Sequence, residues 1–417
     1  METKPAESTR THEIQGHCDD RFREVADAFE RGFTEGGELG ASFCATVGGE
    51  TVVDLWGGHA DPERTRPWDK DTTTVVMSST KGATALAAHL LVARGELDLD
   101  LPVATYWPEF AANGKEGVLV RHLLNHQAGV PALRDPLPDG GFFDWEMVTA
   151  RLAAEAPFWE PGARHGYHAL TFGYLVGEVV RRVTGRSLGT FVADEISDPL
   201  GLDLHIGLPD AHHASVAPLV PPPMPAPDDA IPAFYVQAMT DPASLPALVL
   251  GNTGGYMVPG AWNDPAALRA EIPAAGGVTN ARSLAAMYRA IVHDRRVGDT
   301  EITPEHLALM GSVQSAGGLD ATLSSPGRWT LGFLKAGAAP RGVLPPSTIA
   351  ISDDAFGHTG NGGSYGFADP GCDASFAFVM NQMQMAMGLT PTGQALADAL
   401  YRALGYQRNR GDLWVRP

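Results

Sequence analysis

Six residues, Met77-Ser78-Ser79-Thr80-Lys81-Gly82, stand directly before an apolar segment that extends to Leu91. If a helix begins at Ser78, the side chains of Ser78 and Lys81 lie on one face of it, because residues three positions apart are neighbours on a helix. The positive end of the helix dipole would then lie behind the serine. The stretch therefore predicts a nucleophile beside a potential base, with a simple helix-capping serine as the alternative.

The rarity of lysine makes Lys81 informative. The chain contains only five lysines among its 30 Lys and Arg residues. Arginine stays charged at working pH, whereas a buried lysine can lose its proton and then take part in proton transfer. A lysine that reaches solvent from a core helix is the structural alternative.

The chain is acidic, with a formal net charge of −19 over 417 residues. Such a surface repels nucleic-acid phosphates and anionic membranes, so we expect a small-molecule partner, no nucleic acid and no membrane. The polar N-terminus lacks the apolar region of a signal peptide, which predicts a cytoplasmic protein. Three widely spaced cysteines fit neither a disulfide framework nor a cysteine-based zinc site. The composition favours no particular oligomeric state.

Both ends of the chain carry strand patterns, whereas the middle is mainly helical. Residues 19–33 have helical periodicity and precede two strands, 40–47 and 51–56, joined by a hairpin turn. Further helices are expected at residues 117–126, 145–154, 170–183 and 281–292. Strand character returns later and a helix closes the chain, at residues 329–334, 356–368, 375–381 and 394–404.

This order predicts an α/β (α+β) protein built from two lobes. Residues 19–70 and 321–417 form an α/β lobe, residues 71–320 form an inserted, mainly helical lobe, and residues 1–18 form a flexible tail.

The segment 218–262 is rich in proline and carries the aromatic residues Phe234, Tyr235 and Tyr256. A structureless loop of this length in a compact protein is usually functional, because its aromatic side chains need something to cover. We therefore expect this segment to form one wall of a site, with these three aromatic residues contacting the substrate.

Two further stretches carry residue types that fit a catalytic site. In the first, residues 159–173, a Pro-Gly turn precedes Tyr167, which falls just before a predicted helix and can project from a loop. In the second, residues 356–364 read as a glycine-rich strand containing His358-Thr359-Gly360. Glycines within a strand indicate close approach of the backbone to a ligand, or a bulge.

Together these stretches resemble the serine hydrolases of the penicillin-binding protein and class C β-lactamase superfamily, and most closely its family VIII carboxylesterases. Ser78-x-x-Lys81 matches the nucleophile motif, Tyr167 matches the tyrosine of the second motif, and His358-Thr359-Gly360 matches the Lys/His-Thr-Gly element. The resemblance covers residues 20–405. It implies an antiparallel sheet flanked by helices with an inserted helical lobe, and an enzyme without a cofactor or metal.

The resemblance also implies a mechanism. Ser78 attacks a carbonyl and forms an acyl-enzyme, Lys81 and Tyr167 share the proton movements, and the backbone N–H groups of Ser78 and Asn361 hold the oxyanion. Because an ammonium favours a neighbouring phenolate, we assign Tyr167 as the general base, sustained by Lys81.

Two departures from the family pattern point to neutral esters. Ala169 stands where β-lactamases commonly have an asparagine that recognises the substrate amide, and His358 replaces a permanent cation. Small or medium acyl esters are therefore expected as substrates, bound by His358, Thr359 and Gly360.

Two other patterns are interpreted as structural. Residues 185–189 spell Gly-x-Ser-x-Gly but follow a helix instead of a strand, which predicts a helix–helix turn. His122 and His126 have metal-ligand spacing on a helix, yet no carboxylate completes a site, so no metal is expected.

Three alternatives to an esterase stay open. An acyltransferase or amide-forming enzyme would use the same acyl-enzyme, and a β-lactamase or D-aminopeptidase-type amidase is disfavoured by Ala169 and His358. A binding protein without catalysis would usually lack one of Ser78, Lys81 and Tyr167, and all three are present.

Overall fold

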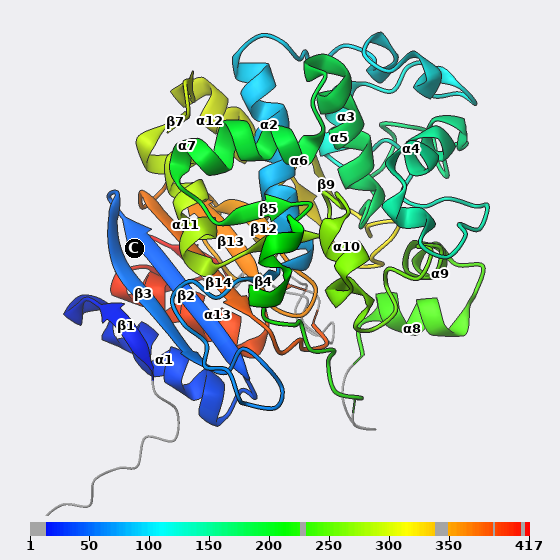
Figure 1. Cartoon of the computed structure of the whole chain (residues 1–417). Coiled ribbons are helices and arrows are strands. Elements are labelled where there is room, and N and C mark those ends of the chain that lie inside the picture. Colours follow the sequence, from blue (N-terminus) through cyan, green and yellow to red (C-terminus); the bar gives the residue numbers. More distant parts are fainter. Residues whose placement is uncertain (1–13, 226–230, 338–348, 387, 410–412) are drawn as a thin grey trace, which may run out of the picture.

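The computed structural model describes residues 14–225, 231–337, 349–386, 388–409 and 413–417 (Figure 1). Residues 1–13 of the predicted flexible tail lie outside the described residues. Gln15–Cys18 form an edge strand that pairs with residues 53–56, so the predicted tail does not include them. Their polar side chains gave no strand pattern, because the pairing is made by the backbone.

A single antiparallel sheet organises the molecule and joins the two ends of the chain. Hydrogen-bonded neighbours follow one another across nine strands in the order β1 (Gln15–Cys18), β3 (Glu50–Gly58), β2 (Gly40–Val47), β14 (Ala374–Met380), β13 (Tyr365–Asp369), β12 (Phe356–Thr359), β11 (Leu334–Lys335), β10 (Arg328–Trp329) and β9 (Ser315–Ala316).

Helices cover both faces of this sheet, as Figure 1 shows. Helix α1 (Arg23–Thr34) packs against α13 (Pro391–Ala403) on one face and buries Val25 and Phe29, one helical turn apart. Helix α11 (Ala281–Arg289) packs on β14 and β2 from the other face. Because both faces are covered, every residue of the central strand β14 is buried and no polar–apolar alternation is seen there.

The remaining helices form the second part of the molecule around α2. This helix is buried from Lys81 to Leu91 and packs on α5 and α6. The helices are α2 (Lys81–Ala93), α3 (Val120–Leu124), α4 (Trp145–Ala154), α5 (Thr171–Thr184), α6 (Leu188–Val192), α7 (Asp198–Leu200), α8 (Ala233–Thr240), α9 (Leu245–Gly251), α10 (Pro265–Arg269) and α12 (Pro304–Gly311).

Three small sheets complete the described part of the chain. One has the order β4 (Thr74–Val75), β6 (Gly277–Thr279), β5 (Leu204–Ile206), and the two others pair β7 (Arg296–Val297) with β8 (Thr300–Glu301) and β15 (Gln407–Arg408) with β16 (Trp414–Val415).

The division into lobes at residues 71 and 320 stays a prediction, and two elements between these residues belong to the sheet layer. Helix α11 packs on the large sheet, and β9 is its last strand. The strand expected at 356–368 is two strands, β12 and β13, joined by a turn, and the strand expected at 329–334 is β10 and β11. Glycine-containing turns split both predicted strands.

The segment 218–262, expected to lack secondary structure, contains α8 and α9. Two of the prolines that indicated a loop stand at the starts of these helices: Pro232 is the N-cap of α8, and Pro246 lies in the first turn of α9. Proline is tolerated there because the first N–H groups of a helix have no intrahelical partner. Pro232 and Pro246 therefore mark helix boundaries.

A buried carboxyl beside α1 predicts a pH-dependent stability. Glu38 is 4% exposed, accepts a hydrogen bond from Gln384 Nε2 at 3.2 Å, and burial raises its pKa from 4.5 to about 8. Between these two pH values the Glu38 carboxyl is ionised in the unfolded chain, whereas in the folded protein it still holds its proton. Stability therefore falls by about 1.4 kcal/mol per pH unit across this window and is level above it.

We expect Glu38→Gln to remove this fall, so that the variant is about 4 to 5 kcal/mol more stable than the wild type at pH 8 and about equal to it at pH 4. Urea unfolding at both pH values measures the difference. Glu35→Gln, which changes an exposed carboxyl on the same turn, is the control. Equal stabilities of wild type and Glu38→Gln at pH 8 would contradict the prediction.

Candidate active site

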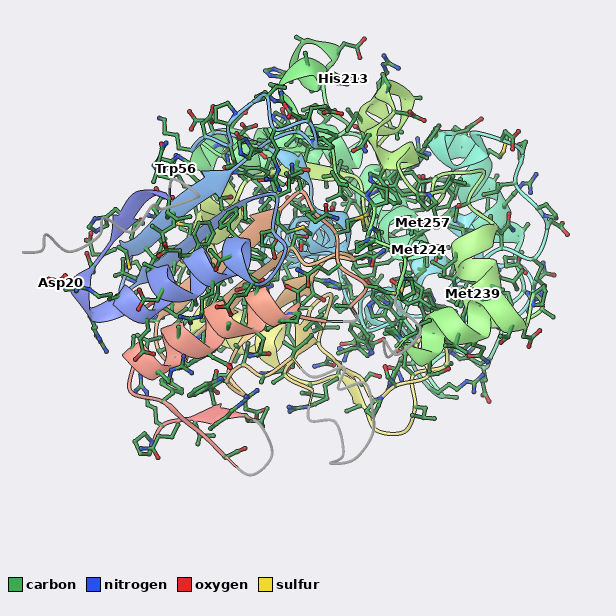
Figure 2. All side chains as sticks on the ribbon, turned by 90° about the horizontal axis from the view of Figure 1, so that it is seen from below. Asp20, Trp56, His213, Met224, Met239 and Met257 are labelled. Atoms are coloured by element: carbon green, nitrogen blue, oxygen red, sulfur yellow. The ribbon has the colours of Figure 1, made fainter. Side chains whose placement is uncertain are left out.

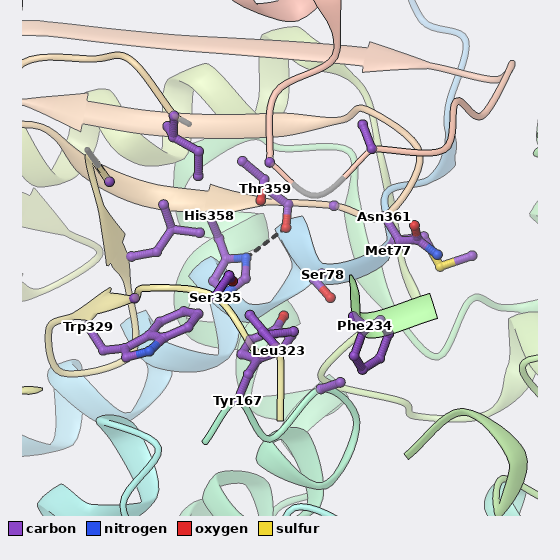
Figure 3. Close-up of a pocket in the computed structure, with 18 of the residues that line it drawn as sticks. Met77, Ser78, Tyr167, Phe234, Leu323, Ser325, Trp329, His358, Thr359 and Asn361 are labelled. Carbon is purple, nitrogen blue, oxygen red and sulfur yellow. Dashed lines mark hydrogen bonds between the residues drawn. The ribbon is translucent and has the colours of Figure 1, made fainter. Parts of the chain in front are cut away.

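Three stretches that are distant in the sequence meet at one cavity of about 160 Å³. Its lining includes Ser78, Tyr167, His358, Thr359 and Asn361, and Figure 3 shows the Ser78 and Tyr167 side chains pointing towards one another below β12. Gly360 also lines it, between Thr359 and Asn361. The sequence-predicted serine, tyrosine and His-Thr-Gly element are thus brought together.

A strained turn places Ser78. The α-helix begins at Lys81 instead of Ser78, and Met77–Thr80 form a 3₁₀ helix before it. Met77 has a φ of +46°, a left-handed conformation that is uncommon for a side chain of this size. In a 3₁₀ helix residues three apart eclipse one another, so the expected pairing of Ser78 with Lys81 is retained. Backbone strain of this kind recurs at functional sites.

Lys81 is buried and held by three oxygen atoms. Its Nζ lies 3.1 Å from Ser78 Oγ, 2.6 Å from the Ala169 carbonyl and 2.9 Å from the Ala274 carbonyl. The side chain is 0% exposed, and its three polar partners are all uncharged. Burial without a neighbouring carboxylate lowers the pKa of Lys81 well below its usual value.

Tyr167 lies between Lys81 and an aromatic cluster. Its ring stacks on Trp329 at 5.1 Å with an interplanar angle of 8°, and Lys81 Nζ lies 4.8 Å from the ring centroid. Burial raises the pKa of Tyr167 above its usual value, and the Ser78 hydroxyl offsets only part of that rise.

These two shifts weigh against the expected ion pair, which stays a prediction. A Tyr167 phenolate sustained by a Lys81 ammonium requires both groups to be charged, whereas burial favours the neutral phenol and the neutral amine. The sequence shows the two residue types but not the loss of water around them, and this desolvation decides which charge states are stable.

His358 is a neutral residue in this site. Its Nδ1–H donates to the Thr359 carbonyl at 2.8 Å, and burial lowers the pKa of His358 to about 3, with a smaller contribution from Lys81. Nε2 is buried and, among the described residues, has no hydrogen-bond partner. The ring therefore presents an acceptor, not a cation, to the cavity.

Two of the three aromatic residues predicted for the wall line the cavity. Phe234 and Tyr235 do so from α8, and the Tyr235 hydroxyl donates to Asn361 Oδ1 at 2.9 Å. Tyr256 does not reach the cavity, and its predicted role is wrong. It is 1% exposed and packs on Phe142 and Phe143, because the turn after Gly255 directs it into the core.

Sequence reasoning missed most of the apolar lining and one buried carboxylate. The cavity also contacts large side chains to which the sequence assigned no role in a site: Met77, Leu170, Val249, Leu250, Met257, Leu323, Trp329, Leu334 and Ile349.

Asp320 is 1% exposed, and its Oδ1 accepts hydrogen bonds from the backbone N–H groups of Tyr167, Thr322 and Leu323 at 2.9, 2.9 and 2.8 Å. It joins the catalytic tyrosine candidate to a wall of the cavity.

The patterns interpreted as structural lie outside the cavity. Ser187 of the Gly-x-Ser-x-Gly stretch caps α6 directly after α5 and is hydrogen-bonded to Glu271 Oε1 at 2.6 Å, so the predicted helix–helix turn is confirmed. Within the described ranges, no group of three or more His, Cys, Asp or Glu side chains could hold a metal ion. A search of the same residues found no helix with the length and apolar character needed to cross a bilayer.

A serine beside a buried lysine and a tyrosine, at an apolar cavity lined by β10, β11 and β12 of an antiparallel sheet, defines a serine hydrolase site. The Beta-lactamase family model matches residues 25–401, and the chain belongs to this family of esterase and β-lactamase hydrolases. The resemblance to penicillin-binding proteins, class C β-lactamases and family VIII carboxylesterases is thereby confirmed, together with the fold class.

Three relatives illustrate the similarity. The esterase/beta-lactamase LipL of Mycobacterium tuberculosis is 35% identical over 385 residues, which are 90% of this chain and 85% of LipL. The crystal structure of a family VIII carboxylesterase has 38% identity and a TM-score of 0.79, covering 94% of this chain and 100% of that one. A penicillin-binding protein homologue from Caulobacter crescentus has 39% identity, a TM-score of 0.79 and the same two coverages.

The contacts of Asp320 predict that it positions Tyr167. In Asp320→Ala three backbone N–H groups lose their acceptor, so Tyr167 and Leu323 shift, and we expect kcat/KM for p-nitrophenyl butyrate to fall about 100-fold. Asp320→Asn keeps an acceptor oxygen and should lose much less. Asp299→Ala, at an exposed position, is the control. Full activity in a folded Asp320→Ala protein, with folding checked by circular dichroism, would exclude a positioning role.

Proposed function

We propose that this protein is a carboxylesterase that cleaves small to medium acyl esters through an acyl-enzyme on Ser78. The observation that carries the proposal is the 3.1 Å contact between Lys81 Nζ and Ser78 Oγ, since Ser78 lines a largely apolar cavity. The names of the esterase relatives support an ester as the substrate.

The partners of Lys81 support it as the base that activates Ser78. A neutral amine has two N–H groups and one lone pair. With the N–H groups donated to the carbonyls of Ala169 and Ala274, the lone pair faces the Ser78 hydroxyl. Ser78 Oγ then bonds to the ester carbonyl carbon while its proton passes to Lys81. Tyr167, as a neutral phenol, gives its proton to the departing alcohol and regains one from Lys81.

Backbone N–H groups of Ser78 and Asn361 are the proposed donors to the oxyanion. Both residues line the cavity, and Ser78 stands at the start of the helical turn that continues into α2. The hydrogen bond from Tyr235 to the Asn361 side chain restrains the second donor. Preorganised donors of this kind are among the largest contributions to catalysis of acyl transfer.

The size and charge of the cavity support a short, uncharged acyl group. Its 160 Å³ compares with the roughly 150 Å³ of an engineered protein cavity that binds benzene, which corresponds to an acyl chain of about six carbons. Both cations that line it are engaged: Arg328 pairs with Asp353 at 2.6 Å, and Lys335 donates to the Gly311 carbonyl at 3.0 Å. With His358 neutral, a substrate carboxylate would find no ready counter-charge among these residues.

Slow hydrolysis of β-lactams is a second candidate activity, favoured by the name of the esterase/beta-lactamase LipL. Ala169 offers no side-chain amide to an acylamino group, so turnover of a chromogenic lactam is expected to be much slower than that of an ester. Acyl transfer to an alcohol would use the same acyl-enzyme, and product partition between water and added alcohols would reveal it.

Acylation of Ser78 is the central test. Intact-mass spectrometry with a graded series of p-nitrophenyl esters should show one added acyl group on the wild type and none on Ser78→Ala. Esterase activity should fall at least about 10⁴-fold in the variant, and acylation should be fastest near six carbons. Ser79→Ala, which changes the neighbouring hydroxyl, is the matched control. Full activity in Ser78→Ala would reject the proposal.

The identity of the base is tested separately. Lys81→Arg places a permanently charged guanidinium where the neutral amine lies. This group cannot accept a proton at working pH, so acylation should fall about 10³-fold, whereas Tyr167→Phe should lose less. Because the pKa of Lys81 is depressed and that of Tyr167 is raised, the wild-type kcat/KM should reach its plateau below the ordinary lysine pKa of about 10.4 and stay level up to pH 10. It should fall in acid as the amine gains a proton. A rate that climbs steadily up to pH 10 would indicate the phenolate as the base instead.

A further inference from the structure

The wall segment differs in charge from the rest of the molecule. The segment 218–262 contains three charged residues among 45, Asp228, Asp229 and Asp241, and no lysine or arginine. The whole chain is 19% charged and carries a net charge of −19. So low a share of charged residues is unusual in so acidic a protein. The segment borders the mouth of the proposed ester site.

Large apolar side chains on this segment face solvent. Val236 and Met239, one turn apart on α8, are 41% and 67% exposed, and Met224 and Val258 are 91% and 59% exposed. We call these four residues the apolar rim. Figure 2 shows Met224 and Met239 on the same side of the molecule as Met257, which lines the cavity. Exposed apolar groups that gather at one place usually mark a binding surface.

The other side of α8 faces the proposed site. Phe234 and Tyr235 line the cavity directly before Val236 in the sequence. Phe234 belongs to a small apolar cluster with Ala132 and Val249 that is separate from the main core. Side-chain hydrogen bonds also hold α8, from Tyr235 to Asn361 at 2.9 Å and from Ser324 to Gln237 at 3.0 Å. One short helix therefore carries both the rim and part of the acyl pocket.

We propose that the apolar rim binds the surface of aggregated, uncharged esters, such as a triacylglycerol droplet, and so delivers substrate to the cavity. This inference rests on the proposed esterase function and specifies its substrate class as water-insoluble neutral esters. The charge pattern selects this partner: the rim has no cation to hold anionic headgroups, and a net charge of −19 repels an anionic surface. Contact at the rim places an acyl chain of the substrate beside the wall that Phe234 and Tyr235 form. The chain can then pass from the droplet into the cavity with little of its apolar surface exposed to water.

The test compares tributyrin hydrolysis below and above its solubility limit. The wild-type rate should rise about tenfold when droplets form, because binding at the rim concentrates the enzyme at the substrate. Val236→Glu/Met239→Glu should lose this rise, since carboxylates oppose contact with an apolar phase, and should keep its rate on dissolved tributyrin. Leu101→Glu, at a position 40% exposed and outside the wall segment, matches Val236→Glu and should retain the rise.

Each outcome has a defined meaning. If Ser78→Ala still hydrolyses dissolved tributyrin at the wild-type rate, the proposed esterase function of Ser78 is wrong, whatever the result at droplets. The rim proposal is overturned if the wild type hydrolyses dissolved tributyrin without a rise above saturation, or if the double variant keeps the rise. Analytical ultracentrifugation addresses the alternative occupant: a wild-type dimer that Val236→Glu/Met239→Glu converts to monomers would make the rim a self-interface and also overturn the proposal.

Discussion

Burial of the Lys81 amine without a carboxylate partner is the constraint on which the site depends. A buried ammonium carries a large desolvation penalty unless an opposite charge compensates it, so the neutral amine is favoured. The carbonyls that satisfy it come from Ala169, two residues after Tyr167, and from Ala274, just before β6. Three separate segments must therefore be correctly packed before Lys81 and Ser78 can meet.

The large sheet fixes the opposite side of the site. Strand β12 pairs with β13, whose five residues are all buried, and the turn between them carries Gly360 and Asn361. At Gly360 a Cβ atom would lie 2.2 Å from the carbonyl of Val76, two residues before Ser78. Only glycine allows this approach, so the His-Thr-Gly element is also the place where the sheet packs against the nucleophile turn.

The sequence predicted those parts of the site whose chemistry is local. Ser78 and Lys81 are three residues apart, so their pairing could be predicted from the sequence. The order of strands and helices could also be predicted, because it follows from the periodicity of apolar residues. Asp320 was not, because its role depends on a hydrogen bond to Tyr167 across 153 positions. The Tyr256 prediction was wrong because an aromatic residue in a proline-rich segment can turn either to a cavity or to the core. The protonation of Lys81 and Tyr167 depends on burial, which no spacing encodes.

The same loss of water supports the proposal that the substrate is an uncharged ester. His358 is neutral, Arg328 and Lys335 are engaged with other groups, and burial lowers the pKa of Lys81. A charged substrate would lose its hydration without gaining a partner, whereas a neutral ester loses little on entry. Charge then develops only as the carbonyl is attacked, on an oxygen that backbone dipoles can stabilise. A site arranged in this way binds a charged substrate poorly, but it stabilises the negative charge that forms on the carbonyl oxygen in the transition state.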